Sequence, residues 1–140
     1  MLDPAVRCLL IDSGKIEPNE IFYPLTCYEH LKGKYGISPL GKVYSVRTKR
    51  IMKSRVNKPH KYLYISLGSH EAKKTVSIHR LVALHFVPNL DKKREVHHID
   101  GNPLNNAYWN LQWVTGDENQ AFHQCNVDFM KDQRRNRDNN

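Results

Sequence analysis

Residues 95–123 decide the fold of this chain, and they read EVHHIDGNPLNNAYWNLQWVTGDENQAFH. Residues 95–99 and 111–115 are short runs typical of strands, and residues 100–110 between them are rich in Asn, Gly and Pro, as a loop would be. Residues 116–122 follow as the start of a helix. The stretch therefore predicts a strand, a long loop, a second strand and a helix.

Two helix signals lie within and before this unit. Thr115 with Glu118 three residues later has the spacing of a capping box, so a helix is expected to begin there. Upstream, side chains recur at spacings of three and four residues, which indicates an amphipathic helix that stops before Pro88. These residues are Val76, Ile78, Leu81, Val82, His85 and Phe86.

Two β regions precede that helix. Residues 35–50 contain two short runs joined by a tight turn at 39–41, which predicts a hairpin. Residues 62–67 alternate between two faces and end at Gly68, which predicts a further strand. Together these regions predict one small antiparallel sheet and an α+β fold class.

The composition indicates a small basic protein. The 140 residues carry a formal net charge of +8, so a polyanionic partner is expected. The three cysteines are widely spaced and odd in number, which favours neither a disulfide framework nor a four-thiolate zinc site, and a reducing cytosol is the expected location. No apolar run is long enough to cross a bilayer, so no membrane association is expected.

An ordered series of motifs runs through the fold-determining stretch. It consists of His97-His98, Asp100-Gly101-Asn102, Asn105-Asn106, Trp109-Asn110-Leu111, Trp113-Val114-Thr115 and Glu118-Asn119. In this order the stretch resembles the HNH endonucleases, whose active site is a ββα-metal unit. Three upstream motifs are similar to those of phage and mobile-intron homing endonucleases. They are Tyr35-Gly36-Ile37-Ser38, Gly41-Lys42-Val43-Tyr44-Ser45 and His79-Arg80-Leu81-Val82-Ala83.

The resemblance covers about residues 21–123 and divides the chain into four parts. The expected order is an N-terminal extension (1–20), a basic β-sheet DNA-binding module with a connecting helix (21–92), an HNH ββα-metal nuclease unit (93–125) and a basic polar tail (126–140). The tail has no apolar periodicity and is expected to be disordered.

The resemblance implies roles for five residues. His98 matches the general base that takes a proton from the attacking water, and Asn110 matches the position that holds the loop and orients that base. His97 and Asn119 match two metal ligands. His123 lies four residues after Asn119, on the same helix face, and is either a third ligand or a surface histidine.

The implied cofactor is one divalent metal ion. Mg²⁺ or Mn²⁺ is expected first. His97 departs from the aspartate common among homing relatives, and because imidazole favours transition metals, Ni²⁺ and Zn²⁺ are alternatives.

Residues outside these roles receive structural interpretations. Asn105 and Asn106 are expected to form turns, and Trp109 and Trp113 to pack in the core rather than stack on bases. A zinc site that joins Cys125 to His97 is a minor alternative. The histidines expected to be structural or exposed are His30, His60, His70 and His85.

The predicted hairpin is the expected DNA-binding element, because a two-stranded ribbon fits the major groove. The basic residues on it or just after it are Lys42, Arg47, Lys49, Arg50, Lys53 and Arg55. A solvated charged hairpin is the alternative interpretation. The charges predict contacts with phosphate, but they predict neither the target sequence nor the oligomeric state.

The main hypothesis is a phage or mobile-element homing endonuclease that hydrolyses phosphodiester bonds in double-stranded DNA, in the cytoplasm of a bacterial host cell. A non-catalytic DNA-binding protein on the same HNH scaffold is the alternative from another class. The basic charge alone also motivates a third hypothesis, a small RNA-binding protein.

Overall fold

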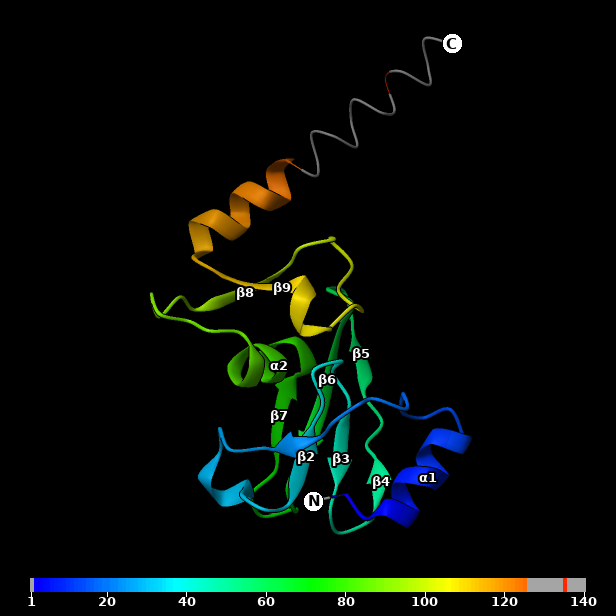
Figure 1. Cartoon of the computed structure of the whole chain (residues 1–140). Helices are drawn as coiled ribbons and strands as arrows, with labels where there is room; N and C mark the ends of the chain where they lie inside the picture. The colour runs from blue at the N-terminus through cyan, green and yellow to red at the C-terminus, as the bar shows by residue number, and fades with distance from the viewer. Residues whose placement is uncertain (1, 126–134, 136–140) are drawn as a thin grey trace.

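The structure, a computed structural model, describes residues 2–125 and residue 135. Its elements are α1 (Pro4–Asp12), β1 (Tyr23–Pro24), η1 (Glu29–Leu31), β2 (Tyr35–Ile37), β3 (Val43–Ser45), β4 (Arg50–Ile51), β5 (Arg55–Asn57), β6 (Tyr62–Leu67), β7 (Lys74–Ser77), α2 (Ile78–Phe86), β8 (Glu95–His98), η2 (Tyr108–Asn110) and β9 (Leu111–Val114). Residues 116–125 are helical and follow β9 (Figure 1). Apart from residue 135, the tail expected to be disordered lies outside the described residues.

The strands form three antiparallel sheets, ordered β1-β2-β3-β4, β5-β6-β7 and β8-β9. The α+β fold class is confirmed, but the prediction of one upstream sheet is wrong. The β2–β3 hairpin and β6 belong to different sheets, because β5 and β7 pair with the two edges of β6 and leave neither edge free.

Helix α2 connects the upstream sheets to the β8–β9 hairpin, which lies above it in Figure 1. Leu81 and Val82 on this helix are fully buried, in the same core as Leu67 of β6 and Val96 of β8. Burying these apolar side chains is the main force that holds the two parts together. None of the helices in the described part of the chain has the length and hydrophobicity to span a bilayer.

The helix α2 is shorter than the side-chain spacing predicts. Val76 lies on β7, where it pairs with Ile65, and the helix begins only at Ile78 with Ser77 as its N-cap. Val76 is therefore buried by a strand rather than by a helix face. The shift illustrates how a partner strand overrides a three- and four-residue spacing.

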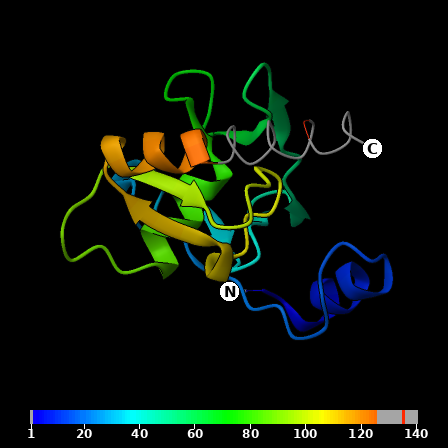
Figure 2. The same ribbon diagram turned by 90° about the horizontal axis from the view of Figure 1, so that it is seen from above.

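The predicted capping box is confirmed. The Glu118 backbone N–H donates to the Thr115 hydroxyl at 3.2 Å, and the Thr115 N–H donates to the Glu118 carboxylate at 3.0 Å. The helix that begins here lies along the β8–β9 hairpin when the molecule is seen from above (Figure 2). This placement brings the first turns of the helix next to β8.

The two tryptophans lie in different environments. Trp113 is buried, and its indole N–H donates to the Val87 carbonyl at 3.0 Å, which confirms it as a core residue. Trp109 is 61% exposed, so the prediction that it packs in the core is wrong. Polar side chains hold its loop together, as described below, and the loop does not need an apolar anchor at this position.

The N-terminal extension contains α1, a helix that the sequence analysis does not predict. Its signals are Asp3, whose side chain accepts a hydrogen bond from the Ala5 N–H at 2.8 Å, and Pro4 in the first turn. Leu10 on this helix packs with Phe22 and Tyr44 in a second, smaller core. This contact holds the extension against β3.

The turn between β2 and β3 contacts the loop that precedes β9. The Tyr108 N–H donates to the Pro39 carbonyl at 2.8 Å. Gly41 in this turn has a φ of +92°, and a Cβ built on it would lie 3.0 Å from the Cβ of Asn106 and 3.2 Å from Ile78. Glycine is therefore required there both by backbone conformation and by space.

Candidate active site

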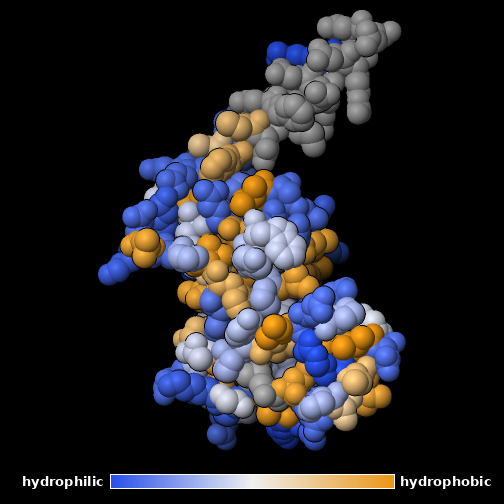
Figure 3. All heavy atoms as spheres, in the orientation of Figure 1, coloured by the Kyte–Doolittle hydropathy of each residue, from blue (hydrophilic) through white to orange (hydrophobic). Residues whose placement is uncertain are grey.

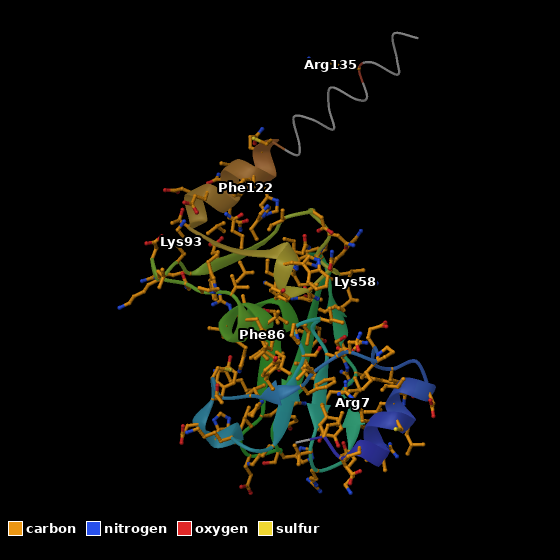
Figure 4. All side chains as sticks on the ribbon, viewed as in Figure 1. Arg7, Lys58, Phe86, Lys93, Phe122 and Arg135 are labelled. Atoms are coloured by element: carbon orange, nitrogen blue, oxygen red, sulfur yellow. The ribbon has the colours of Figure 1, made fainter. Side chains whose placement is uncertain are left out.

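The paired histidines lie on β8 and point in opposite directions, as alternation along a strand requires. His98 is 5% exposed and faces the core, on the same side as Val96. His97 points toward the helix of residues 116–125, where its ring stacks on Phe122 at 4.4 Å between centroids. Figure 4 shows Phe122 on that helix, above the hairpin.

Both histidines nevertheless line one cavity of about 210 Å³. Its lining residues are His60, Tyr62, Val96, His97, His98, Gly101, Pro103, Asn119 and His123. Four of the five residues singled out for catalysis or metal binding are in this set, and Asn110 is outside it. The cavity is the candidate active site.

The imidazole of His98 is fixed by neighbours on two sides. Its Nε2 lies 2.8 Å from the Asn106 amide oxygen, which is an acceptor, so Nε2 is assigned the proton and Nδ1 is left to accept one. The rings of Tyr62 and His79 pack against it at centroid distances of 5.8 and 5.0 Å. His98 therefore has the tautomer and the restrained orientation that a general base needs.

Asn106 was expected only to form a turn, and that interpretation is incomplete. Its side chain is buried, at 4% exposure, and is the hydrogen-bond partner of His98. Asn110 instead joins the two ends of the loop. Its side-chain amide donates to Asp100 at 2.8 Å and to the Asn105 carbonyl at 2.9 Å, and its side-chain oxygen accepts from the Asp100 N–H. Asn110 thus holds the loop, and a different asparagine, Asn106, holds the His98 ring.

The side chains of His97, Asn119 and His123 lie close together. Burial lowers the pKa of His97, and repulsion from His123 and His98 acts in the same direction, while a hydrogen bond with Asn119 opposes the shift. A lowered pKa keeps the imidazole neutral, which is the form that binds metals. The Asn119 amide nitrogen donates to Glu95 at 2.7 Å, so its oxygen is the atom that faces His97.

Two imidazoles and an amide oxygen make a donor set that suits metals with affinity for imidazole. Among the described residues, no group of three or more His, Cys, Asp or Glu side chains could hold a metal ion. A metal in this cavity would therefore need a ligand of another residue type, and the Asn119 amide oxygen is a candidate. Cys125 is exposed, and nothing in the described chain joins it to His97 in a zinc site.

His79 is a functional candidate that the sequence analysis did not assign. Burial, with repulsion from His98 and Arg80, lowers its pKa to about 4. Within the described chain its Nδ1 is buried without a hydrogen-bond partner. His79 therefore stays neutral beside His98 and adds no positive charge at physiological pH.

The basic residues predicted to bind DNA are distributed along the molecule. Lys42 forms an ion pair at 3.1 Å with Glu20, whose side chain is fully buried, so its charge is used within the fold. Arg47 and Lys49 lie in the β3–β4 turn, at the opposite end of β3 from the turn that contacts the loop of Asn106 (Figure 1).

The other three basic residues lie on β4, on β5 and on the segment that joins these two strands. Arg50 is on β4, Lys53 follows it, and Arg55 begins β5; all three are exposed. Hydrophilic residues are spread over both the upper and the lower part of the visible face (Figure 3). The predicted basic residues therefore do not gather at the cavity.

Comparison with known proteins identifies two segments of the chain. Residues 76–121 match the family model described as HNH endonuclease, and residues 20–68 match the NUMOD4 motif. Residues 76–121 are an HNH endonuclease domain. The HNH domain includes α2, β8, β9 and the start of the last helix. It holds four of the five residues predicted for catalysis or metal binding, and the fifth, His123, lies two residues beyond it.

A solved structure agrees with this assignment. The structure entitled "DNA binding and cleavage by the HNH homing endonuclease I-HmuI" matches with a TM-score of 0.67 and 32% identity, over 76% of this chain and 59% of that chain. The resemblance to HNH homing endonucleases is confirmed.

Three of the curated relatives come from viruses. DNA endonuclease I-HmuI of Bacillus phage SP01 is 39% identical over 60% of this chain and 48% of the relative. An HNH endonuclease of Acanthamoeba polyphaga mimivirus, L245, is 37% identical over 64% and 27%. H-N-H endonuclease F-TflII of Escherichia phage T5 is 31% identical over 59% and 43%. The chain spans less than half the length of each of these relatives.

Proposed function

We propose that this chain hydrolyses phosphodiester bonds in duplex DNA with the help of one divalent metal ion. The supporting observation is the cavity in which His98, held by Asn106, lies beside His97, Asn119 and His123. This arrangement would put a general base next to a set of metal-binding side chains.

Each side chain would contribute one part of the reaction. His98 would take a proton from the attacking water at Nδ1, the nitrogen that Asn106 leaves free. His97, Asn119 and His123 would hold the ion, which supplies charge stabilisation to the phosphate and the leaving oxygen. Glu95 would keep the Asn119 amide turned so that its oxygen faces His97.

We further propose that exposed basic side chains bind the DNA backbone away from the cavity. The residues are Arg47, Lys49, Arg50, Lys53 and Arg55. Lys42 is left out because it neutralises Glu20. Binding would weaken with salt, since each phosphate contact adds about one unit to the slope of log affinity against log salt. The phage relatives support a phage- or mobile-element-encoded enzyme that acts in the cytoplasm of a bacterial host.

The decisive experiment incubates a supercoiled plasmid with the full chain and Mg²⁺, Mn²⁺, Ni²⁺ or Zn²⁺, and separates nicked from linear products. We expect cleavage that EDTA abolishes. His98→Ala should lose cleavage and keep its DNA affinity, because the base acts on the chemical step. His70→Ala, an exposed histidine on the β6–β7 turn, is the matched control and should cleave normally.

Two results would contradict the proposal. Cleavage by His98→Ala at the wild-type rate would remove His98 from the role of base. A chain that binds duplex DNA but cleaves it with none of the four metals would instead support a non-catalytic DNA-binding protein.

A further inference from the structure

One wall of the cavity comes from outside the HNH domain. His60 and Tyr62 belong to the β5–β6 turn and to β6, within the segment that matches the NUMOD4 motif. The other lining residues belong to β8, to the loop after it and to the helix of residues 116–125. The candidate active site is therefore completed by a part of the chain that carries none of the HNH motifs.

His60 has a defined position relative to the base. Its ring is nearly parallel to that of Tyr62, with centroids 6.1 Å apart and planes 19° apart. Tyr62 is in turn nearly parallel to His98, at 5.8 Å and 16°. The turn that carries His60 is closed by a hydrogen bond from the Lys61 N–H to the Asn57 carbonyl at 2.6 Å. His60 is thus placed by ring packing and by a closed turn, although it is exposed to solvent.

The charge of this region suits an anion. In the described structure four histidines and no carboxylate line the cavity. Lys58 and Lys61 flank His60 on the turn, are exposed, and make no ion pair with any described residue. Figure 4 shows Lys58 at the end of β5 that lies near the loop of residues 100–110. A ligand that suits these features is a DNA phosphate that lies between the β5–β6 turn and His98.

We propose that His60 donates a hydrogen bond to a non-bridging oxygen of the DNA phosphate in this cavity, while Lys58 and Lys61 contact neighbouring phosphates. This inference rests on the proposed nuclease function. It requires no proton transfer, because a neutral imidazole always carries one N–H. A donor aimed at charge that develops during the reaction stabilises the transition state more than the bound substrate.

The first test measures single-turnover plasmid cleavage by His60→Ala and His60→Gln at saturating protein. His60→Ala should be slower by about 100-fold, the effect of removing one such donor. His60→Gln should recover part of the rate because the glutamine amide also donates. The metal concentration that gives half the maximal rate should stay at the wild-type value, and His70→Ala should match wild type.

Two outcomes of this test would overturn the inference. A wild-type rate for His60→Ala would show that the side chain does not contact the reacting phosphate. A slow rate that excess metal restores would make His60 a metal ligand instead of a phosphate donor. Thermal unfolding of each variant checks folding, and His60→Gln carries the test if His60→Ala is unstable.

A second readout does not depend on cleavage. We expect the ring Cε1–H NMR signal of His60, identified by its loss in His60→Gln, to shift when duplex DNA is added in EDTA, while the His70 signal stays in place. An unmoved His60 signal in a chain that cleaves DNA would refute the inference and leave the proposed function intact. A wild-type chain that fails to cleave would refute the function, and the NMR shift would still decide whether His60 contacts DNA.

Discussion

Replacing Asn106 with alanine should remove the hydrogen bond that holds the His98 ring in place. The lost hydrogen bond is 2.8 Å long and joins side chains that are only 4% and 5% exposed, so water cannot readily replace the missing acceptor. Leaving the buried His98 N–H without a partner should cost about 1–3 kcal/mol of folding stability. The rate should fall as well, because His98 loses the group that fixes its tautomer.

The size of the rate effect follows from this orienting role. Buried partners that orient a metal-binding histidine are typically worth about 10- to 100-fold in activity, and we expect a loss of the same order for His98. Single-turnover cleavage measures this loss, and urea unfolding measures the stability. DNA affinity should hardly change, because Asn106 is not among the residues that line the cavity.

Asn105→Ala is the matched control for this prediction. The Asn105 amide donates to Asp100 near the surface of the same loop, at 2.9 Å, and within the described structure His98 hydrogen-bonds to Asn106 instead. It should lose less than about 1 kcal/mol and keep its cleavage rate. If Asn106→Ala cleaves as fast as Asn105→Ala, the hydrogen bond does not orient the base and the reasoning fails.

Three further predictions concern the turn, the buried histidine and the metal. Gly41→Ala should lose about 1–3 kcal/mol of folding stability and also cleave more slowly, because its Cβ would press on Asn106. The control is Gly14→Ala, which has a φ of +71° but open space around it and should lose stability without losing cleavage rate. Equal cleavage rates for the two variants would argue against the contact with Asn106. Because the folded chain holds the pKa of His79 at about 4, below the usual 6.5, the unfolded chain binds more protons between these values. Folding stability should therefore fall by up to about 3 kcal/mol as the pH drops through this window, as measured by urea unfolding without metal. His79→Gln should show a weaker dependence of stability on pH, and parallel stability curves for the variant and the wild type would contradict the prediction. His97→Asp should keep activity and move metal preference toward Mg²⁺, because a carboxylate replaces an imidazole, and an unchanged order in metal titrations would count against His97 as a ligand.

Local signals in the sequence predict local structure well. The capping box at Thr115 and the strand at 62–67 depend on residues within a few positions of each other, and both are confirmed. The helix α1 had equally local signals in Asp3 and Pro4, but its apolar run is too short to show a helical period. Its position is instead decided by packing on Tyr44, far along the chain.

The candidate site was predictable only in part. The resemblance identified His97, His98 and Asn119, which the structure brings to one cavity. The contribution of Tyr62 arises from contacts between sheets, and no pattern along the sequence reports such a contact. The pairing of Lys42 with buried Glu20 was missed for the same reason, since the two residues are far apart in sequence.

The contact between Gly41 and Asn106 has a consequence for how such proteins recombine. A turn in the segment that matches the NUMOD4 motif lies against Asn106, the asparagine that hydrogen-bonds to His98 of the HNH domain. Because of this contact, we expect that neither segment can be replaced by its counterpart from another protein without affecting the other, even though separate family models describe them. A chimera that joins this HNH domain to another upstream module would inherit a working set of side chains, yet its activity would depend on whether the new module supplies a glycine turn of the same shape.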